Sequence, residues 1–258
     1  MSEIEIYCGV CNYPMTAKAV DKSVVQRFHD LTLENIKFRY DLDGFVVVKN
    51  LFADYELDPV LEIFRKRADE KFSGIMNLDR EVKEVFEMVT DKRMKEILET
   101  LQSAPVSLLQ TMFLFKEVGS PYAAQAWSPH QDNAYPMARI EAYLTGNICF
   151  SDQDPNNGGM YIYPGSHEEG LLPFRAAESF HETPGTSPGN VVRVPTAYER
   201  IDLRMKKGDV LFLHGCVIHG SYPNASKIRS RPMLLIPYIT AGESFIPGEK
   251  AKRKEVLL

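Results

Sequence analysis

The spacing of apolar residues predicts helices in the first hundred residues of the chain. Apolar side chains recur there at intervals of three and four, the period that gathers them on one face of a helix. Amphipathic helices are therefore predicted near residues 57–64, 82–89 and 94–101. A shorter helix is predicted from Thr32 to just before the turn Asp43-Gly44, and the apolar run 45–48 that follows indicates a strand. Residues 1–104 are thus expected to be a mostly helical flank with one early strand.

After Pro105 the pattern changes to short apolar or alternating runs separated by turn residues, which predicts strands. The predicted strands lie in 106–116, 142–150 and 159–163, and the turns in 154–159, 184–189 and 207–209. Short strands at this spacing are typical of a β-sandwich or a jelly roll. Residues 168–190 have little regular pattern and are interpreted as either a surface loop or a lid. We expect one domain over 1–258, with its β core in 105–258.

The composition is that of an ordinary globular protein. Of the 258 residues, 44% are hydrophobic and 25% are charged, which excludes disordered and collagen-like classes. The net charge of -5 disfavours a nucleic-acid partner, which would select a basic face. No apolar run reaches membrane-spanning length, and the first residues lack a secretory signal pattern. We therefore expect a cytoplasmic enzyme that acts on a small molecule, while nothing indicates its oligomeric state.

Four cysteines, namely Cys8, Cys11, Cys149 and Cys216, suggest a reducing compartment because only the first two are close in sequence. The pair Cys8 and Cys11 has the C-x-x-C spacing of half a zinc site or of a redox pair. Neither a second half-site nor a thioredoxin-like β-α-β pattern follows it. We therefore leave the pair without a predicted role.

The segment His130-Gln131-Asp132 offers two metal-binding side chains two residues apart. On a strand, residues at this spacing project from the same face, and His219 supplies a third candidate ligand after the predicted strand 209–214. We expect residues 217–221 to continue that strand. Two imidazoles and one carboxylate form the facial triad of non-haem iron oxygenases, which leaves three coordination positions open. The alternative is a local hydrogen-bonded pair and a histidine that is satisfied within the core.

Several segments, in the same order along the chain, resemble the phytanoyl-CoA dioxygenase family of 2-oxoglutarate oxygenases. They are 40–48 (YDLDGFVVV), 130–132 (HQD), 157–167 (NGGMYIYPGSH), 207–209 (KGD) and 219–221 (HGS). The resemblance implies a double-stranded β-helix, which is a cupin-like jelly roll, with flanking helices. It also implies that Fe(II) is held by His130, Asp132 and His219, with 2-oxoglutarate as cosubstrate and O2 as oxidant.

The same resemblance implies residues that bind 2-oxoglutarate. An arginine after the distal histidine suits the far carboxylate of the cosubstrate because its planar fork forms two hydrogen bonds. The family spacing falls on Ser230, so the candidates are Arg229 and Arg231, and we prefer Arg231 because a strand follows it directly. Gln110 and Ser221 match cosubstrate-binding positions in one branch of the family. A purely structural hydrogen bond is the alternative for both.

Other polar and aromatic residues are candidates for the substrate pocket. Thr145, Asn147 and Cys149 share one face of a predicted strand, and that face is expected to line the iron pocket. Asn147 either orients a ligand or makes a structural hydrogen bond. Trp127, Asn133 and Tyr135 flank the His-x-Asp segment. His167 resembles a turn element of the family, and His29 and His181 lack metal-binding neighbours. His214 is set aside because His219 has the family position.

The resemblance implies hydroxylation with release of succinate and CO2, and the polar pocket candidates Asn133, Tyr135 and Asn147 favour a small, polar metabolite as substrate. Asp132 favours hydroxylation, because related halogenases lack this carboxylate and place a halide there. Two other readings stay open. One is a catalytically silent jelly-roll metal binder or sensor, and the other is a cupin-like metalloenzyme that does not use 2-oxoglutarate.

Overall fold

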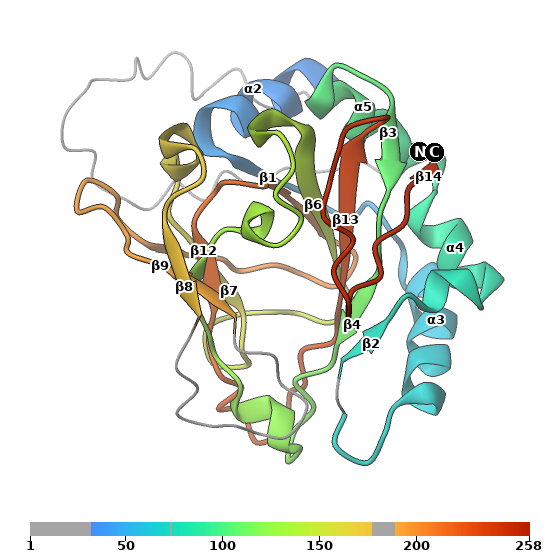
Figure 1. The fold of residues 1–258 in the computed structure, drawn as a ribbon. Helices are drawn as coiled ribbons and strands as arrows, with labels where there is room; N and C mark the ends of the chain where they lie inside the picture. Colours follow the sequence, from blue (N-terminus) through green and yellow to red (C-terminus); the bar gives the residue numbers. More distant parts are fainter. Residues whose placement is uncertain (1–31, 73, 177–188) are drawn as a thin grey trace.

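The computed structural model describes residues 32–72, 74–176 and 189–258. Within these ranges two antiparallel sheets face each other, and helices cover the outer side of the larger one (Figure 1). The larger sheet has the order β1 (Phe45–Val48), β11 (Val210–His214), β6 (Tyr143–Cys149), β13 (Met233–Thr240), β3 (Val106–Leu108) and β14 (Val256–Leu257). In addition, β4 (Met112–Leu114) pairs with β13 and with β2 (Ile75–Met76).

The smaller sheet has the order β10 (Ile201–Asp202), β7 (Met160–Ile162), β12 (His219–Ser221) and β5 (Trp127–His130). A separate pair, β8 (Phe174–Ala176) and β9 (Asn190–Val192), extends beside it in Figure 1. The two facing antiparallel sheets are the jelly-roll architecture that the strand spacing and the family resemblance predicted. Of the segment 168–190, which was interpreted as a loop or a lid, residues 177–188 lie outside the described ranges.

The predicted helices are confirmed as α2 (Leu33–Asp43), α3 (Asp54–Arg67), α4 (Lys83–Val89) and α5 (Lys92–Gln102). Thr32 caps the first of them, since its hydroxyl accepts a hydrogen bond from the Asn35 amide at 3.3 Å. That helix ends at Gly44, whose φ of 77° is the left-handed conformation favoured by glycine. Short 3-10 turns are η1 (Leu78–Arg80), η2 (Pro121–Ala124), η3 (Asp132–Ala134), η4 (Ile140–Ala142) and η5 (Ser166–Glu169).

Strand alternation divides the core into two layers. Val46 and Val48 of β1, with Val210 and Phe212 of β11, pack in the cluster that contains the helix residues Leu57 and Leu98, among others. The intervening residues of the same strands face the smaller sheet, where they form a second cluster with residues such as Met160 and Ile162. Each central strand of the larger sheet is therefore buried on both faces, which explains its continuous apolar sequence.

The structure corrects three sequence expectations. Residues 106–116 form two strands, β3 and β4, in place of one run. Asp132 lies in η3 after β5 has ended, so it does not share a strand face with His130. Finally, β11 ends at His214 and the chain crosses to the smaller sheet, so β12 is not its continuation. Gly215 permits this crossing, because a Cβ there would lie 2.7 Å from the Tyr143 carbonyl oxygen.

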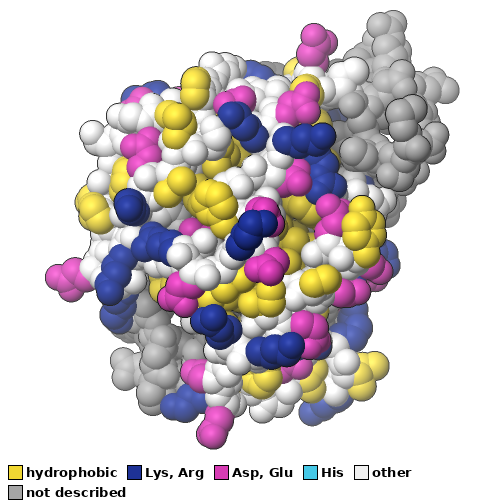
Figure 2. Space-filling model, turned by 90° about the vertical axis from the view of Figure 1, so that its right-hand side faces the viewer, with side chains coloured by type: hydrophobic (Ala, Val, Ile, Leu, Met, Phe, Trp, Pro, Cys, Tyr) yellow, Lys and Arg dark blue, Asp and Glu magenta, His cyan; other side chains and the backbone are white. Residues whose placement is uncertain are grey.

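The face formed by the flanking helices carries both signs of charge. In Figure 2, Lys and Arg side chains alternate with Asp and Glu side chains and with apolar patches. This face therefore lacks the single-sign basic surface that nucleic acids select. Among the helices in the described ranges, none has the length and apolarity needed to cross a membrane.

Candidate active site

Three side chains from the smaller sheet and its edge meet at one point. His130 at the end of β5 and His219 at the start of β12 are register partners, and their ring centroids lie 4.3 Å apart. One carboxylate oxygen of Asp132, Oδ1, lies 3.5 Å from the Nε2 atom of each histidine. The three ligand atoms lie within 4.8 Å of one another, and no other such group occurs in the described ranges. This spacing fits a single metal ion.

Backbone carbonyls set the tautomer of both histidines. The Nδ1 atom of His130 lies 2.8 Å from the Ser128 carbonyl oxygen, and that of His219 lies 3.1 Å from the Val217 carbonyl oxygen. A carbonyl only accepts, so each Nδ1 carries the proton and donates it. Each Nε2 therefore presents its lone pair toward Asp132, the arrangement found in metal-ligating histidines.

The electrostatics of the three groups favour an ionised Asp132. Burial by itself would raise the pKa of this carboxyl group, but the charges and hydrogen bonds of His219 and His130 lower the pKa well below its ordinary value. Burial by itself would lower the pKa of His219. The negative charge of Asp132 and its hydrogen bond outweigh burial, so the pKa of His219 is raised. An anionic oxygen beside two nitrogen donors is the ligand set that non-haem Fe(II) sites use, so the residues fit this ion.

A hydrogen-bond chain from the larger sheet supports the carboxylate. The Thr145 hydroxyl donates to Asp132 Oδ2 at 3.3 Å, and the Asn147 amide donates to the Thr145 hydroxyl at 3.1 Å. Asn147 also donates to the Leu211 carbonyl oxygen at 3.1 Å, which fixes its position within the sheet. Asn147 therefore acts on the site through Thr145.

A cavity of about 450 Å³ opens beside the three ligands. Its lining includes several of the residues that the sequence singled out, namely Gln110, Trp127, Tyr135, Thr145, Ser221 and Arg231. Asn133 and Asn147 are not part of that lining. The Asn133 side chain instead exchanges two hydrogen bonds of 3.0 Å with the backbone of Ala138. Gln110 is 4% exposed, and no protein partner for its side-chain amide is found among the described residues.

The two candidate arginines have different surroundings. Arg231 is buried and lines the cavity, and its Nε donates to the Gly158 carbonyl oxygen at 2.9 Å. No carboxylate in the described ranges pairs with it, and burial lowers its pKa to about 10. Arg229 forms a forked ion pair with Asp154 at 2.8 and 3.1 Å. Of these two candidates, Arg231 is the one whose guanidinium is available to an anion in the cavity.

Lys116 is a buried cation that the sequence reasoning missed. Its ammonium donates to the Ser221 hydroxyl at 2.8 Å, to the Tyr222 carbonyl oxygen, and to the Gly158 carbonyl oxygen at 3.4 Å. Burial, together with the nearby Arg231, lowers the pKa of Lys116 well below its usual value. The available signal was a lysine directly after the apolar residues 112–115, where a strand is expected to end in the core.

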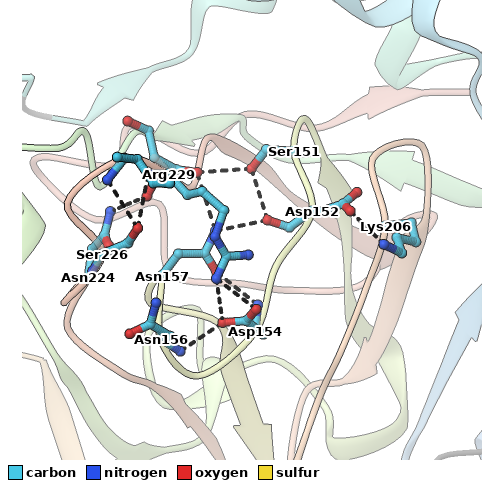
Figure 3. A network of polar contacts seen from close by, with 11 residues as sticks. Ser151, Asp152, Asp154, Asn156, Asn157, Lys206, Asn224, Ser226 and Arg229 are labelled. Carbon is cyan, nitrogen blue, oxygen red and sulfur yellow. Dashed lines mark hydrogen bonds and ion pairs between the residues drawn. The ribbon is translucent and has the colours of Figure 1, made fainter.

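Figure 3 shows a network of polar contacts around Asn157, Asn224 and Arg229. The Asn157 amide donates to the Asp152 carbonyl oxygen at 2.8 Å, and Asn224 donates to the carbonyl oxygens of Lys116 and Arg229 at 2.8 and 2.9 Å. Ser226 accepts from the Arg229 amide at 3.0 Å. The Asn157 amide also donates to the Ser230 carbonyl oxygen at 3.4 Å, which joins the loop that carries Gly158 to the loop that carries both arginines. The network therefore sets the position of the buried cations.

The remaining histidines and cysteines in the described ranges lie away from the three ligands. His214 Nδ1 accepts from the Cys216 amide at 3.1 Å, so its Nε2 carries the proton and donates to Glu141 at 3.1 Å. His167 bonds to the Asp41 carbonyl oxygen at 3.1 Å. Cys149 and Cys216 are buried free thiols. The predictions for Cys8, Cys11, His29 and His181 lie outside the described residues.

Known proteins resemble the chain in sequence and in fold. Human peroxisomal phytanoyl-CoA dioxygenase is 26% identical over 228 residues, which cover 76% of this chain and 65% of the human protein. The chain thus spans somewhat under two thirds of the length of this relative. The epimerase SnoN, solved in complex with Fe3+, alpha ketoglutarate and nogalamycin RO, superposes with a TM-score of 0.67 at 23% identity, over 83% of this chain and 86% of SnoN.

The carbocyclase SnoK, also from nogalamycin biosynthesis, superposes with a TM-score of 0.66 at 20% identity, over 86% of this chain and 88% of SnoK. At these identities the two enzymes establish the fold, which confirms the predicted jelly roll. The family model described as phytanoyl-CoA dioxygenase (PhyH) matches residues 40–233, a span that includes all three candidate ligands. The chain therefore belongs to the phytanoyl-CoA dioxygenase family, as its sequence motifs predicted.

Proposed function

We propose that the chain is an Fe(II)- and 2-oxoglutarate-dependent dioxygenase that hydroxylates a small metabolite, with release of succinate and CO2. One observation carries the proposal: the His130, Asp132 and His219 ligand atoms share a cavity with Arg231, a buried guanidinium that no carboxylate among the described residues pairs with. A facial ligand set and a separate anion-binding group are what iron and a dicarboxylate cosubstrate require. The complex of SnoN with Fe3+ and alpha ketoglutarate supports the same pairing.

The residues around the cavity have distinct tasks in this proposal. His130, Asp132 and His219 would hold the iron, which with 2-oxoglutarate supplies the activation of O2 that side chains alone do not provide. Arg231 and the Ser221 hydroxyl would bind the far carboxylate, and the Gln110 amide would bind the cosubstrate through one of its free donors. Thr145 keeps Asp132 oriented through its hydrogen bond.

The cavity wall bears on the substrate. The prediction of a polar substrate relied on Asn133, Tyr135 and Asn147, of which only Tyr135 lines the cavity. Much of the wall is apolar, with contributions from Met76, Met112, Leu114, Leu235 and Pro237. We therefore propose a small metabolite that combines a polar group with an apolar portion.

Purified protein tests the proposal through succinate formation from 2-oxoglutarate. We expect formation only when Fe(II), O2 and 2-oxoglutarate are all present. The Asp132→Ala variant should lose more than about 100-fold of this activity, because removal of an outer-shell partner alone costs about 10–100-fold. The matched control is Asp58→Ala, which removes an exposed carboxylate that pairs with Lys207 on the surface.

The outcomes separate the competing functions. Iron binding without succinate formation would favour the catalytically silent metal binder. Turnover of a substrate without 2-oxoglutarate would favour the cupin-like metalloenzyme. Full activity in Asp132→Ala would show that the ligand assignment is wrong.

A further inference from the structure

A second positively charged part of the cavity comes from the last residues of the chain. Gly248, Lys250, Ala251 and Arg253 line the same cavity as the three metal ligands. The family model ends at residue 233, so this wall lies beyond the region matched to the family. A feature that is specific to this segment is therefore a candidate determinant of the substrate.

Hydrogen bonds hold the segment in a fixed position. A turn forms between its ends, where the Lys252 amide donates to the Gly248 carbonyl oxygen at 2.9 Å. The Asn77 side chain donates to the Ala251 carbonyl oxygen at 2.9 Å, and Arg80 donates to the Lys252 carbonyl oxygen at 2.8 Å. The segment is thus attached to η1, and its cations are presented to the cavity by a constrained backbone.

Arg253 has unused capacity to donate hydrogen bonds. One terminal nitrogen of its guanidinium donates to the carbonyl oxygens of Ile246 and Pro247 at 3.2 and 3.4 Å, while its buried Nε has no partner. Neither Arg253 nor Lys250 forms an ion pair with a carboxylate in the described ranges. Gly248 makes room for the guanidinium, because a Cβ there would lie 3.1 Å from it. A buried donor without a partner is costly, so this geometry suits a ligand that accepts hydrogen bonds.

Two tyrosines connect Arg253 to the metal ligands. Tyr135 and Tyr143 both line the cavity, and both are near enough to Asp132 and Arg253 for each charge to influence their pKa values. Burial is the main influence and raises the pKa of Tyr135 to about 12, so its phenol stays protonated at neutral pH. A ligand anchored at Arg253 would therefore extend past these rings toward the ligands of the metal.

We propose that Arg253, assisted by Lys250, anchors a carboxylate or phosphate group of the substrate, whose apolar portion lies against Met76, Leu235 and Pro237. The proposal rests on the proposed function and names the substrate class of the same site. The shared chemistry is an anion at one end of an apolar chain. A guanidinium binds either anion through a planar pair of hydrogen bonds.

Binding of model ligands tests the proposal. The protein is loaded with Mn(II) and saturating 2-oxoglutarate, and hexanoate, hexyl phosphate and the neutral hexanamide are titrated by calorimetry and by fluorescence of Trp127, the single tryptophan. We expect at least one anion to bind about tenfold or more tightly than hexanamide, which is the effect of one charge-assisted hydrogen bond. The anion whose affinity exceeds that of hexanamide by the larger factor identifies the charged group of the substrate.

Variants locate the anion. Arg253→Gln should abolish the preference over hexanamide, Arg253→Lys should retain part of it, and Lys254→Gln, which alters a neighbouring exposed cation, should leave it unchanged. Equal or undetectable binding of all three ligands to the wild-type protein would overturn the proposal, as would a preference that survives in Arg253→Gln. If the preference were lost in Arg231→Gln and kept in Arg253→Gln, the added anion would be bound by Arg231. This would mean that 2-oxoglutarate does not occupy the Arg231 subsite, and the proposed function itself would then fail.

Discussion

Burial decides between two arginines that are only two residues apart. Arg231 is 1% exposed and faces the cavity, whereas Arg229 has a partly exposed side chain that is neutralised by Asp154. We predict that Arg231→Gln raises the Kd for 2-oxoglutarate by about 10–100-fold, the effect of losing charge-assisted hydrogen bonds. Arg229→Gln is the matched control and should change the Kd by less than about threefold, because Arg229 pairs with Asp154 and does not face the cavity. Equilibrium titration of each variant measures the difference, and a larger effect at Arg229 would reverse the assignment.

Lys116 is expected to position Ser221 without touching the reacting atoms. Its ammonium donates to the Ser221 oxygen at 2.8 Å, which directs the hydroxyl hydrogen elsewhere, toward an acceptor in the cavity. We predict that Lys116→Met raises the KM for 2-oxoglutarate about tenfold and changes kcat much less. The effects of Lys116→Met and Ser221→Ala should be non-additive, because the two residues act as one unit. Additive effects of the two substitutions would contradict this role.

At the level of single residues, sequence motifs identify the metal ligands, but they do not identify neighbouring residues such as Lys116. His130, Asp132 and His219 occur in a recognisable order, and the family match covers all three. Lys116 belongs to none of the motifs, and its importance follows from burial beside Arg231, which only packing reveals. The position of Asp132 in a turn likewise depends on where β5 stops pairing with β12.

The turn 207–209 shows how a short element depends on one buried carboxylate. Asp209 is 1% exposed and accepts hydrogen bonds from the Lys49 ammonium at 2.9 Å, the Asn50 amide at 3.1 Å and the Lys206 amide at 2.8 Å. Removal of this carboxylate leaves a buried cation and two amides without their acceptor. We predict that Asp209→Ala lowers the free energy of unfolding by about 3 kcal/mol, as other broken buried pairs do.

Urea denaturation measures this change, and Glu87→Ala provides the control. Glu87 pairs with Lys83 on the exposed side of α4, where water and salt screen the pair and its loss changes stability little. Similar losses in the two variants would mean that Asp209 is not the anchor of the turn.

Helices were easier to predict than strand connections. The interval of three and four residues located α3, α4 and α5, because one buried face suffices to mark a helix. The step from β11 to β12 left no comparable pattern, because apolar residues continue through Val217 and Ile218 while the chain changes sheet. The close approach of Gly215 to the backbone of Tyr143 permits the crossing, and these two residues are distant in sequence.

For the molecule as a whole, two buried cations have no carboxylate partner in the described ranges. We therefore expect a bound anion to stabilise the folded protein. Arg231 and Lys116 lie close together beside the cavity. Burial lowers the pKa of both side chains. A dicarboxylate that binds only the folded protein stabilises it by about 2.7 kcal/mol at 100 times its Kd. We predict that 2-oxoglutarate at this concentration raises the Tm of the metal-free protein by roughly 5–10 °C.

Scanning calorimetry with a chelator present measures this shift. 2-Oxobutyrate, which lacks the far carboxylate, should have little effect, and Arg231→Gln should respond to neither compound. An equal shift from both compounds would place the stabilising contact at the keto acid end and away from the buried cations.

The global arrangement also places parts of the cavity wall that no local pattern indicates. Residues 248–253 contain ordinary charged and small residues, and they reach the cavity because β14 pairs with β3 and because η1 holds the preceding turn. Such contacts between residues distant in sequence depend on the complete fold. The sequence therefore predicts the metal ligands but not this part of the cavity wall.

The origin of that wall has an evolutionary consequence. The metal ligands lie between residues 130 and 219, whereas residues 248–253 form a short segment after β13, the last long strand of the described ranges. A recombination event in the connection after β13 could exchange this segment between related genes without disturbing a ligand of the metal. If this segment binds the substrate as proposed, its exchange would change the substrate range while the three metal ligands are inherited intact.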